Sequence, residues 1–276
     1  MNTQTQKAAA FRALHQRDGA FIIPNPWDAG TARLLTALGF EALATTSLGL
    51  ANTLGRADGT GAVSRAEVLA NCAEIAGATR LPVSADLENC YAHEPRAAAE
   101  MIRLAAEAGV VGGSIEDATG DAQQPIYEFD LAVERVHAAA EMARSLPFPF
   151  TLTARAENFL HGRRDLDDTI RRLQAFEAAG ADALYAPGLA KADDIRTVCT
   201  SVRKPVNVVM GLKGGSLSVL ELASLGVRRI SLGSALSRAA FGAFMRAARE
   251  IHDFGTFRFS EDATPYAELN NLMAGR

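Results

Sequence analysis

Acidic side chains follow two short apolar segments of the chain. Residues 82–89 read Pro-Val-Ser-Ala-Asp-Leu-Glu-Asn, so Asp86 and Glu88 are spaced i, i+2, and Glu116 follows a second apolar segment. On a β-strand the i, i+2 spacing places both side chains on one face. Clustered carboxylates repel one another unless a cation is near. The three acids therefore predict a divalent-ion site, for Mg²⁺ first and Mn²⁺ as a substitute, although acids of this kind also occur as solvated loop residues or helix caps.

Two further polar residues lie in or at the end of apolar segments. Arg155 ends the run Phe-Thr-Leu-Thr-Ala-Arg, and Asn207 lies within Val-Asn-Val-Val-Met. An arginine here is suited to bidentate binding of a substrate carboxylate or phosphonate; the alternative is an ion pair with Glu157 or Glu116. A buried asparagine needs a hydrogen-bond partner, either a substrate carboxylate or a neighbouring backbone carbonyl.

Three other signals have weaker functional interpretations. Residues 211–216 read Gly-Leu-Lys-Gly-Gly-Ser, similar to a phosphate-binding loop before a helix, but the Walker spacing is missing and a plain loop with a helix cap is favoured. His93 and His161 have no metal-ligand spacing with another histidine, which predicts surface roles. Trp27 follows the first predicted strand and either lines the pocket or packs under the neighbouring loop.

The scaffold that positions these residues is indicated by a repeated pattern. Four predicted helices end in a glycine that leads into a short apolar strand, and three more strands begin at a proline; the residues are Gly39, Gly109, Gly180 and Gly226, then Pro82, Pro149 and Pro205. Glycine is the common residue just beyond a helix end. With residues 21–24 as the first strand, eight strands alternate with helices, which predicts an α/β fold of the (β/α)8 TIM-barrel type. A doubly wound sheet is the alternative, but the chain lacks an early GxGxxG.

Short linkers predict one domain over residues 1–276, with a leading helix near 4–17 and a tail near 253–276 that contains a short helix. Two segments after strands, 46–63 and 117–128, exceed the usual loop length. Both are expected on the face where barrel active sites form, as mobile covers.

Composition excludes several classes of protein. Of the 276 residues 48% are hydrophobic and 22% charged, and the net charge is -4. There is no basic tract for nucleic acid and no apolar run of about 20 residues for a membrane. Cys72, Cys90 and Cys199 are far apart and form no CxxC, and the N-terminal residues lack signal-peptide features. We therefore expect a reducing cytoplasm.

Five segments in this order resemble the isocitrate lyase/phosphoenolpyruvate mutase superfamily, over about residues 19–250. They are Thr46-Ser47-Leu48, Leu54-Gly55 through Asp58, Ala85-Asp86-Leu87-Glu88, Ser114-Ile115-Glu116-Asp117 and Ala154-Arg155-Ala156-Glu157. The resemblance implies a modified barrel whose eighth helix is exchanged between subunits, giving homodimers or homotetramers. It also implies Mg²⁺ and a small α-oxocarboxylate as substrate or product.

The resemblance also implies roles for residues of this chain. Asp86 would be the nearest metal ligand, and Glu88 and Glu116 would act largely through bound water. Arg155 would bind the substrate carboxylate or the departing group, and Asp58 matches an acid of the mobile loop in the mutase branch. Thr46, Ser47 and Leu48 match the segment that holds the carboxylate and oxo end of the substrate.

Departures from the family pattern argue against isocitrate and methylisocitrate lyase activity, and also against phosphonate chemistry. The isocitrate and methylisocitrate lyases carry a Lys-Lys/Arg-Cys-Gly-His loop after the fourth strand, whereas residues 117–126 here read Asp-Ala-Thr-Gly-Asp-Ala-Gln-Gln-Pro-Ile. The mutases usually have Trp-Gly-Ser-Gly-Leu after the second strand and Asn-Ser in the strand-4 loop. Here residues 44–48 read Ala-Thr-Thr-Ser-Leu, and the Asn-Ser pair is missing.

The hypothesis is a Mg²⁺-dependent lyase that cleaves a C–C bond in a small α-oxo dicarboxylate, as in oxaloacetate decarboxylation. Cleavage would leave a pyruvate enolate, stabilised by the metal and by Arg155. The alternatives are a C–P bond enzyme, namely a phosphonopyruvate hydrolase or phosphoenolpyruvate mutase, and a catalytically weak oxoacid-binding barrel. An unrelated phosphate-binding barrel that uses residues 213–216 is a third alternative.

Overall fold

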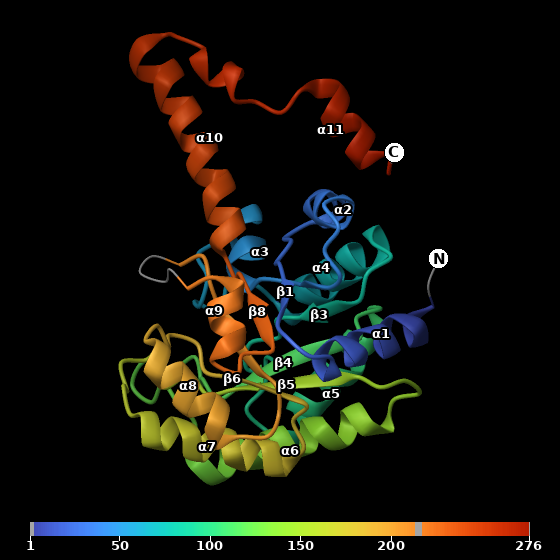
Figure 1. The fold of residues 1–276 in the computed structure, drawn as a ribbon, viewed down its shortest axis with the longest axis vertical. Coiled ribbons are helices and arrows are strands. Elements are labelled where there is room, and N and C mark those ends of the chain that lie inside the picture. Colours follow the sequence, from blue (N-terminus) through green and yellow to red (C-terminus); the bar gives the residue numbers. More distant parts are fainter. Residues whose placement is uncertain (1–2, 213–216, 276) are drawn as a thin grey trace.

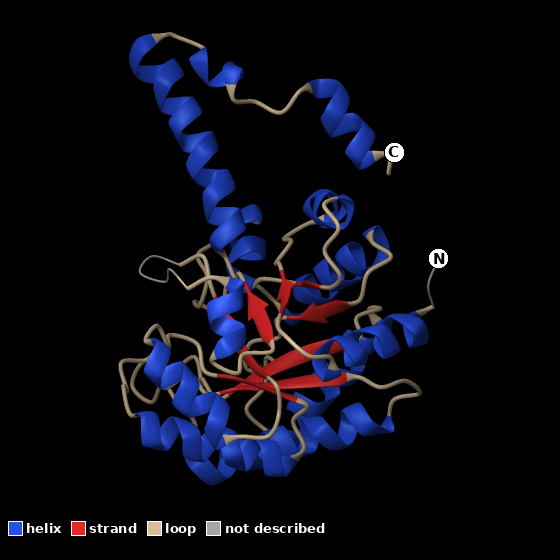
Figure 2. Cartoon of the chain, viewed as in Figure 1, coloured by secondary structure: helices blue, strands red, loops and turns tan. Residues whose placement is uncertain are grey.

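Eight parallel strands form the centre of the molecule, and helices surround them (Figures 1 and 2). The computed structural model describes residues 3–212 and 217–275. The strands are β1 (Phe21–Ile23), β2 (Leu43–Ala44), β3 (Val83–Ala85), β4 (Gly112–Glu116), β5 (Thr151–Arg155), β6 (Ala183–Tyr185), β7 (Val206–Val209) and β8 (Arg229–Ser231). Their order is β1-β8-β7-β6-β5-β4-β3-β2, and every paired neighbour is parallel. The predicted (β/α)8 barrel is confirmed.

The sheet is nearly closed between its first and last members. No strand ladder joins β1 to β2 in the described residues, but the Ala44 amide donates to the Pro24 carbonyl at 3.0 Å. On its other side β2 pairs with β3 through Leu43 and Ala44. This hydrogen bond continues the ring of backbone contacts beside β2, which is the shortest of the eight strands.

Helices precede, separate and follow the strands. They are α1 (Gln4–Gln16), α2 (Ala29–Ala37), α3 (Ser47–Thr53), α4 (Arg65–Ala78), α5 (Pro95–Glu107), α6 (Phe129–Ser145), α7 (Leu166–Ala179), α8 (Ala192–Ser201), α9 (Val219–Ser224), α10 (Ala235–Phe254), the 3-10 turn η1 (Arg258–Glu261) and α11 (Tyr266–Met273). The glycines that the sequence places after α2, α5, α7 and α9 have φ angles from 87° to 110°. Only glycine adopts this left-handed conformation without strain, so these positions end the helices.

One predicted loop is wrong in part. The segment 46–63 was expected to be irregular, but residues 47–53 form α3, which begins at the cap residue Thr46. The Thr46 hydroxyl accepts from the Gly49 amide at 3.4 Å. The phosphate-loop motif at 211–216 lies largely outside the described residues, because the structure describes neither residues 213–216 nor their contacts.

The end of the barrel where the strands begin is closed by α1. Phe11 and Leu14 of this helix pack with Phe21, Ile23 and Val111 in a compact cluster of buried side chains. The rest of the core lies between the strands and α2 to α9. Because α1 fills the barrel interior at this end, the interior opens at the carboxyl ends of the strands.

The last three helical segments leave the barrel. Figure 1 shows α10 rising away from the strands, and α11 returning toward α2. The Arg33 guanidinium of α2 donates to the Met273 carbonyl at 2.7 Å. Across the described ranges, no helix combines the length and the apolar character that crossing a bilayer requires.

Gly112 tests the packing of α1 against the barrel. A Cβ at this position would lie 2.8 Å from Phe11 Cε1 and 2.9 Å from the Thr151 carbonyl oxygen. We expect Gly112→Ala to lower the free energy of unfolding by about 2 kcal/mol, because overpacking forces the backbone or Phe11 to shift. Urea unfolding followed by circular dichroism measures the change.

Gly77 in α4 provides the matched control. No atom lies within 4 Å of a Cβ built there, so Gly77→Ala should raise the free energy of unfolding by about 0.5 kcal/mol through helix propensity. Equal stability of the two variants would contradict the packing described for Gly112.

Candidate active site

A cavity of about 240 Å³ opens at the carboxyl ends of the strands. Seven predicted site residues line it, namely Thr46, Ser47, Leu48, Asp58, Asp86, Arg155 and Asn207. Glu88 and Glu116 are not among the lining residues, but Glu116 lies against Arg155, and Glu88 is held by Tyr91 beside the same strands. The fold therefore brings together residues that are up to about 160 positions apart in the chain, as the barrel geometry requires.

Arg155 lies at the centre of the acidic residues. Its Nη1 is 3.0 Å from Asp86 Oδ1, its Nη2 is 3.1 Å from Glu116 Oε2, and its Nε is 2.8 Å from Glu157 Oε1. The guanidinium also lies 5.2 Å from the centre of the Tyr185 ring. Its side chain is 15% exposed, so one cation faces three carboxylates with little screening by water. Of the two interpretations of Arg155, the ion pairs are present, and they include Asp86 as well as both predicted partners.

The remaining negative charge is incompletely balanced. Burial raises the pKa of Glu116 well above its usual value, and Arg155 opposes this shift only in part. Burial also raises the pKa of Glu88 and of Asp58, and the nearby charge of Asp86 adds to both shifts. A further positive charge near these carboxylates would stabilise their ionised forms.

The donor set fits a hard divalent ion that keeps part of its water shell. Within residues 3–212 and 217–275, no three His, Cys, Asp or Glu side chains converge as direct metal ligands. Mg²⁺ is usually held by one or two carboxylates and several waters. Asp86, at the cavity wall, is the residue best placed to supply such a carboxylate, with Glu88 and Glu116 behind it.

The loop after β3 has a strained backbone, and hydrogen bonds from α6 hold it in place. Glu88, Cys90 and Tyr91 have φ angles of 49°, 61° and 54°, in the left-handed region that non-glycine residues seldom adopt. Buried Arg135 of α6 supports this loop by donating to the carbonyls of residues 89, 92 and 93 at 2.5–2.6 Å. The Tyr91 hydroxyl donates to Glu88. Strain held in this way is typical of functional loops.

The segment after β2 is fixed by hydrogen bonds to the acidic strand. The Ser47 amide donates to Asp86 Oδ2 at 3.1 Å, and the Asp86 amide donates to the Thr45 hydroxyl at 2.8 Å. Ser47 Oγ is 3.5 Å from Asp58 Oδ2. Gly49 permits this approach, because a Cβ there would lie 2.6 Å from Thr46 Cγ2 and 2.8 Å from Trp27 Cβ.

That contact also decides between the two interpretations of Trp27. Trp27 packs against α3 and is absent from the described lining of the cavity. His93 and His161 are exposed, as predicted. The cavity lining in the described residues contains no cysteine or histidine.

Buried charges behind β4 and β5 hold the site in place. Asp117 Oδ1 accepts from the Glu157 amide at 2.8 Å, and Asp117 Oδ2 lies 3.1 Å from Arg172 Nη1. Arg172 also pairs with Asp168 at 2.9 Å. Burial raises the pKa of Asp117 to about 7. The pair orients the backbone that carries Glu157, the residue that anchors Arg155.

Arg229 is a functional candidate that the sequence analysis missed. It is buried inside the barrel and donates through Nε to Asn207 Oδ1 at 2.8 Å and through Nη1 to the Thr153 hydroxyl at 3.0 Å. Burial lowers its pKa to about 10. Asn207 Nδ2 donates in turn to Ser231 Oγ at 3.0 Å. The partners of Asn207 are therefore the side chains of Arg229 and Ser231. The signal available in the sequence was an arginine at the start of β8.

These features define a class of protein: a (β/α)8 barrel with an acidic, arginine-centred site at the carboxyl ends of its strands. The family model for phosphoenolpyruvate phosphomutase matches residues 11–252. The chain belongs to this family, whose wider superfamily also contains the isocitrate lyases.

Individual relatives agree with this assignment. A solved structure from Burkholderia cenocepacia J2315, whose activity is described only as lyase/mutase, is 61% identical; the match covers 98% of this chain and 96% of that one, with a TM-score of 0.96. An uncharacterized protein of Mycobacterium tuberculosis (strain CDC 1551 / Oshkosh) is 32% identical over 94% of each chain. An oxaloacetate decarboxylase of Ectopseudomonas mendocina (strain ymp) is 29% identical over 88% of this chain and 83% of that one.

The buried pair of Asp117 and Arg172 gives a stability prediction. We expect Asp117→Ala to lower the free energy of unfolding by about 3 kcal/mol, because it leaves Arg172 buried beside an empty position. Asp193→Ala is the control, since its ion pair with Arg196 is exposed and exposed pairs contribute little. Denaturant unfolding of both variants measures the difference, and equal midpoints would show that Asp117 has no structural role.

Proposed function

We propose that this protein is a Mg²⁺-dependent lyase that cleaves a C–C bond in a small α-oxo dicarboxylate, in the manner of an oxaloacetate decarboxylase. The observation that carries the proposal is the position of Arg155 among Asp86, Glu116 and Glu157 at the wall of a cavity of about 240 Å³. A cavity of this volume suits a substrate of a few carbon atoms. The printed activity of the relative from Ectopseudomonas mendocina supports the same class of reaction.

Asp86 would hold the metal ion, with Glu88 and Glu116 bonded to its waters. Burial raises the pKa of Glu88 and of Glu116, and the nearby charge of Asp86 adds to both shifts, so a cation beside them would stabilise their ionised forms. A bound Mg²⁺ supplies Lewis-acid polarisation of the oxo and carboxylate oxygens of the substrate. Mn²⁺ has the same preference for oxygen ligands and would substitute for it.

Arg155 would exchange partners when the site is loaded. Two of its nitrogens donate to Asp86, which would hold the metal ion, and to Glu116, which would bond to its waters, so a bound ion would compete with these ion pairs. The Nε contact with Glu157 is independent of the metal and keeps the guanidinium in place. Nη1 and Nη2 then become available for a substrate carboxylate in bidentate geometry.

The other walls supply hydrogen bonds. The hydroxyls of Thr46 and Ser47 and the backbone near Leu48 would bind the carboxylate and oxo end of the substrate. Asn207 would bind a second oxygen, and Arg229 fixes its orientation by donating to its carbonyl oxygen. We assign Asp58 a catalytic role because it lines the cavity next to Ser47.

The chemical step breaks the bond between C3 and the departing carboxylate, which leaves as CO₂. The electron pair of that bond moves into the pyruvate enolate, and a proton taken from solvent water is then added at C3 to give pyruvate. Arg155 stabilises the negative charge that develops on the enolate side, because its guanidinium lies at the cavity wall with little access to water.

A C–P bond reaction is the second candidate, because the matching family model is that of phosphoenolpyruvate phosphomutase. A phosphonopyruvate hydrolase or phosphoenolpyruvate mutase would use the same acidic strand ends. The mutase-like acid Asp58 at the cavity wall favours this candidate. Phosphonopyruvate and oxaloacetate differ in the departing group, so an assay with both substrates separates the two.

The test is a panel of oxaloacetate, other α-oxo dicarboxylates and phosphonopyruvate, assayed with Mg²⁺ and after chelation. We expect metal-dependent formation of pyruvate from oxaloacetate, and about a 1000-fold loss of kcat/KM in Asp86→Ala, since such contacts each contribute a few kcal/mol to the transition state. The exposed variant Asp193→Ala should retain full activity. Pyruvate formation at the same rate in Asp86→Ala would refute the assignment of Asp86, and turnover of phosphonopyruvate alone, seen by phosphorus NMR, would favour the second candidate.

We also propose that α10 is exchanged between subunits of a homodimer or homotetramer. Among its residues in the described chain only Ser237 is buried, and its exposed large apolar side chains are Phe241, Phe244, Met245, Ile251 and Phe254, which are 36% to 77% exposed. At about 100° per residue, Phe241, Phe244 and Ile251 lie within about 80° of one another and form an apolar stripe along the helix. An apolar face of this size is typical of an interface, and a second copy of the same chain offers an identical helix to cover it.

Phe244→Glu and Phe254→Glu test the exchange. A carboxylate at either position would be desolvated in an interface, so we expect the double variant to be a monomer by light scattering while the parent is a dimer or tetramer. Arg249→Glu on the same helix is the control and should leave the assembly unchanged, because at about 100° per residue Arg249 faces away from Phe244 and Ile251. A parent protein that is itself monomeric at micromolar concentration would refute the proposal.

We place this protein in the cytoplasm and treat the chain as one domain. Its three cysteines are free, two of them buried, which is typical of a reducing compartment.

A further inference from the structure

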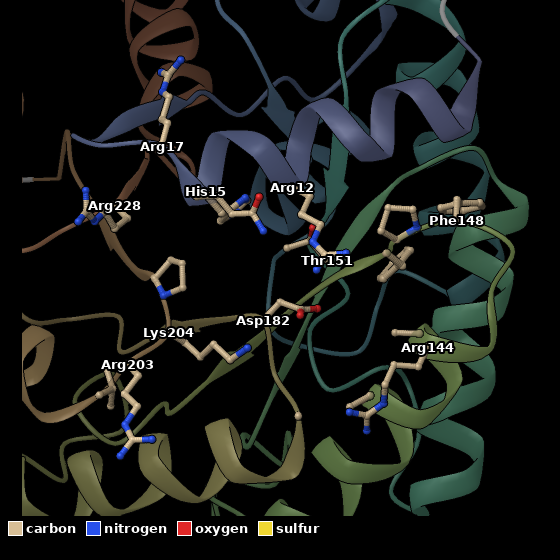
Figure 3. A pocket seen from close by; sticks show the side chains of 18 of the residues that line it. Arg12, His15, Arg17, Arg144, Phe148, Thr151, Asp182, Arg203, Lys204 and Arg228 are labelled. Atoms are coloured by element: carbon tan, nitrogen blue, oxygen red, sulfur yellow. The ribbon is translucent and has the colours of Figure 1, made fainter.

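A second and larger cavity lies at the opposite end of the barrel from the candidate active site. Its volume is about 990 Å³, and it is formed by the end of α1, the end of α6 and the loops that enter β5, β6, β7 and β8 (Figure 3). This is the face where the strands begin, which in barrel enzymes normally serves stability. The volume lies at the upper end of the range for organic ligand sites.

The walls of this cavity are strongly basic. Six cationic side chains line it, namely Arg12, Arg17, Arg144, Arg203, Lys204 and Arg228, and the described lining contains a single carboxylate, that of Asp182. The chain as a whole has a net charge of -4. The cations are therefore concentrated locally, against the overall sign of the protein.

Only two of the six cations have a carboxylate partner in the part of the chain that the structure describes. Arg17 pairs with Glu41 at 2.6 Å, and Arg228 lies 3.9 Å from Asp18. Arg12, Arg144, Arg203 and Lys204 form no salt bridge within the described residues. The positive charge on the walls therefore exceeds what the protein itself neutralises.

Asp182 does not provide the missing charge. Three of these cations, Lys204, Arg12 and Arg144, act electrostatically on its carboxylate, and its Oδ2 already accepts from the Leu152 amide at 3.0 Å. Figure 3 shows Lys204 and Asp182 near the middle of the cavity, with Arg203 and Arg144 on opposite sides. One carboxylate shared among three cations leaves a field that attracts anions.

An apolar ledge completes the cavity. Residues 146–150 read Leu-Pro-Phe-Pro-Phe and contribute to the wall next to Arg144. Phe148 is only partly buried. A planar ring can stack on such a ledge while phosphates attached to it reach the cations.

Helix ends explain part of the basic character. Arg144 lies in the last turn of α6, where a cation interacts favourably with the helix dipole. Arg12 lies within α1 and has no such role, and Lys204 lies three residues beyond the end of α8. The arrangement of cations from three separate elements around one hollow is therefore not accounted for by helix stabilisation.

We propose that this cavity binds an organic polyphosphate of nucleotide size, with its phosphates on Arg12, Arg144, Arg203 and Lys204 and its ring on Phe148. The site is separate from the catalytic cavity and does not depend on the activity proposed for it. Arginine and lysine donors on opposite walls suit a chain of several phosphate groups better than a single carboxylate.

Isothermal titration calorimetry tests the proposal, with inorganic tripolyphosphate and ATP as probes and chelator present to exclude metal-mediated binding. At about 0.15 M ionic strength, surface attraction beyond about 8 Å is screened, so saturable binding at one site per chain is the expected result. Arg12→Glu and Lys204→Glu should each weaken binding by about tenfold or more, because each removes a charge-assisted contact.

Two controls separate this site from others. Arg80 is exposed on the same end of the barrel, before β3, and does not line the cavity, so Arg80→Glu should leave affinity unchanged. Arg155→Ala removes the central cation of the catalytic cavity and should also leave affinity unchanged. Thermal unfolding of each variant verifies that the fold is retained, and Lys204→Arg, which keeps the positive charge, should retain binding.

ATP should bind more tightly than tripolyphosphate, and Phe148→Ala should remove that difference alone. Absence of saturable binding by both probes would overturn the proposal. So would equal weakening by Arg80→Glu, or loss of binding in Arg155→Ala with no effect of Lys204→Glu. Equal affinity for ATP and tripolyphosphate would overturn the placement of a ring on Phe148.

Discussion

Repulsion among carboxylates at the mouth of the barrel is the constraint on which the site depends. Parallel strands end at the same edge, so acids placed after β3, β4 and β5 must approach one another. Arg155 makes this arrangement stable by pairing with Asp86, Glu116 and Glu157 at once. Burial raises the pKa of Glu116, and the charges of Glu157 and Asp86 add to this shift against the opposing charge of Arg155, so one guanidinium faces more negative charge than it carries. The same shortage of positive charge that strains the site also makes it suitable for a divalent ion.

The layer behind these residues is built from buried arginines. Arg172 holds Asp117 against the backbone of Glu157, Arg135 holds the carbonyls of the strained loop after β3, and Arg229 holds Asn207. Each guanidinium has several donors in a rigid plane and can fix more than one acceptor. These three arginines position polar groups inside the barrel. In the described residues none of them forms a salt bridge with Asp86, Glu116 or Glu157, and of the three Arg229 alone lines the cavity.

The two ends of the barrel have opposite electrostatic character. Carboxylates gather where the strands end, and cations gather where they begin. The chain also leaves one element outside this framework, because α10 extends from the barrel with its aromatic side chains exposed. The barrel positions the residues of the candidate active site, while the apolar face of α10 is a surface that the monomer leaves exposed.

Features that depend on local sequence patterns could be predicted from the sequence alone. Glycine after a helix and proline before a strand are read from single residues, so the eight strands and most helix limits followed from the sequence, as did the acids and Arg155 at the strand ends. The helix at 47–53 was missed because its cap, Thr46, lies directly after a strand in a glycine-containing segment that resembles a loop. Only the tertiary structure decided which carboxylates Arg155 contacts, that Arg229 reaches Asn207 and Thr153 across the barrel, and that cations from α1, α6 and the loop before β7 surround one cavity. These contacts join residues far apart in the chain, and their partners are determined by barrel closure, which no local pattern encodes.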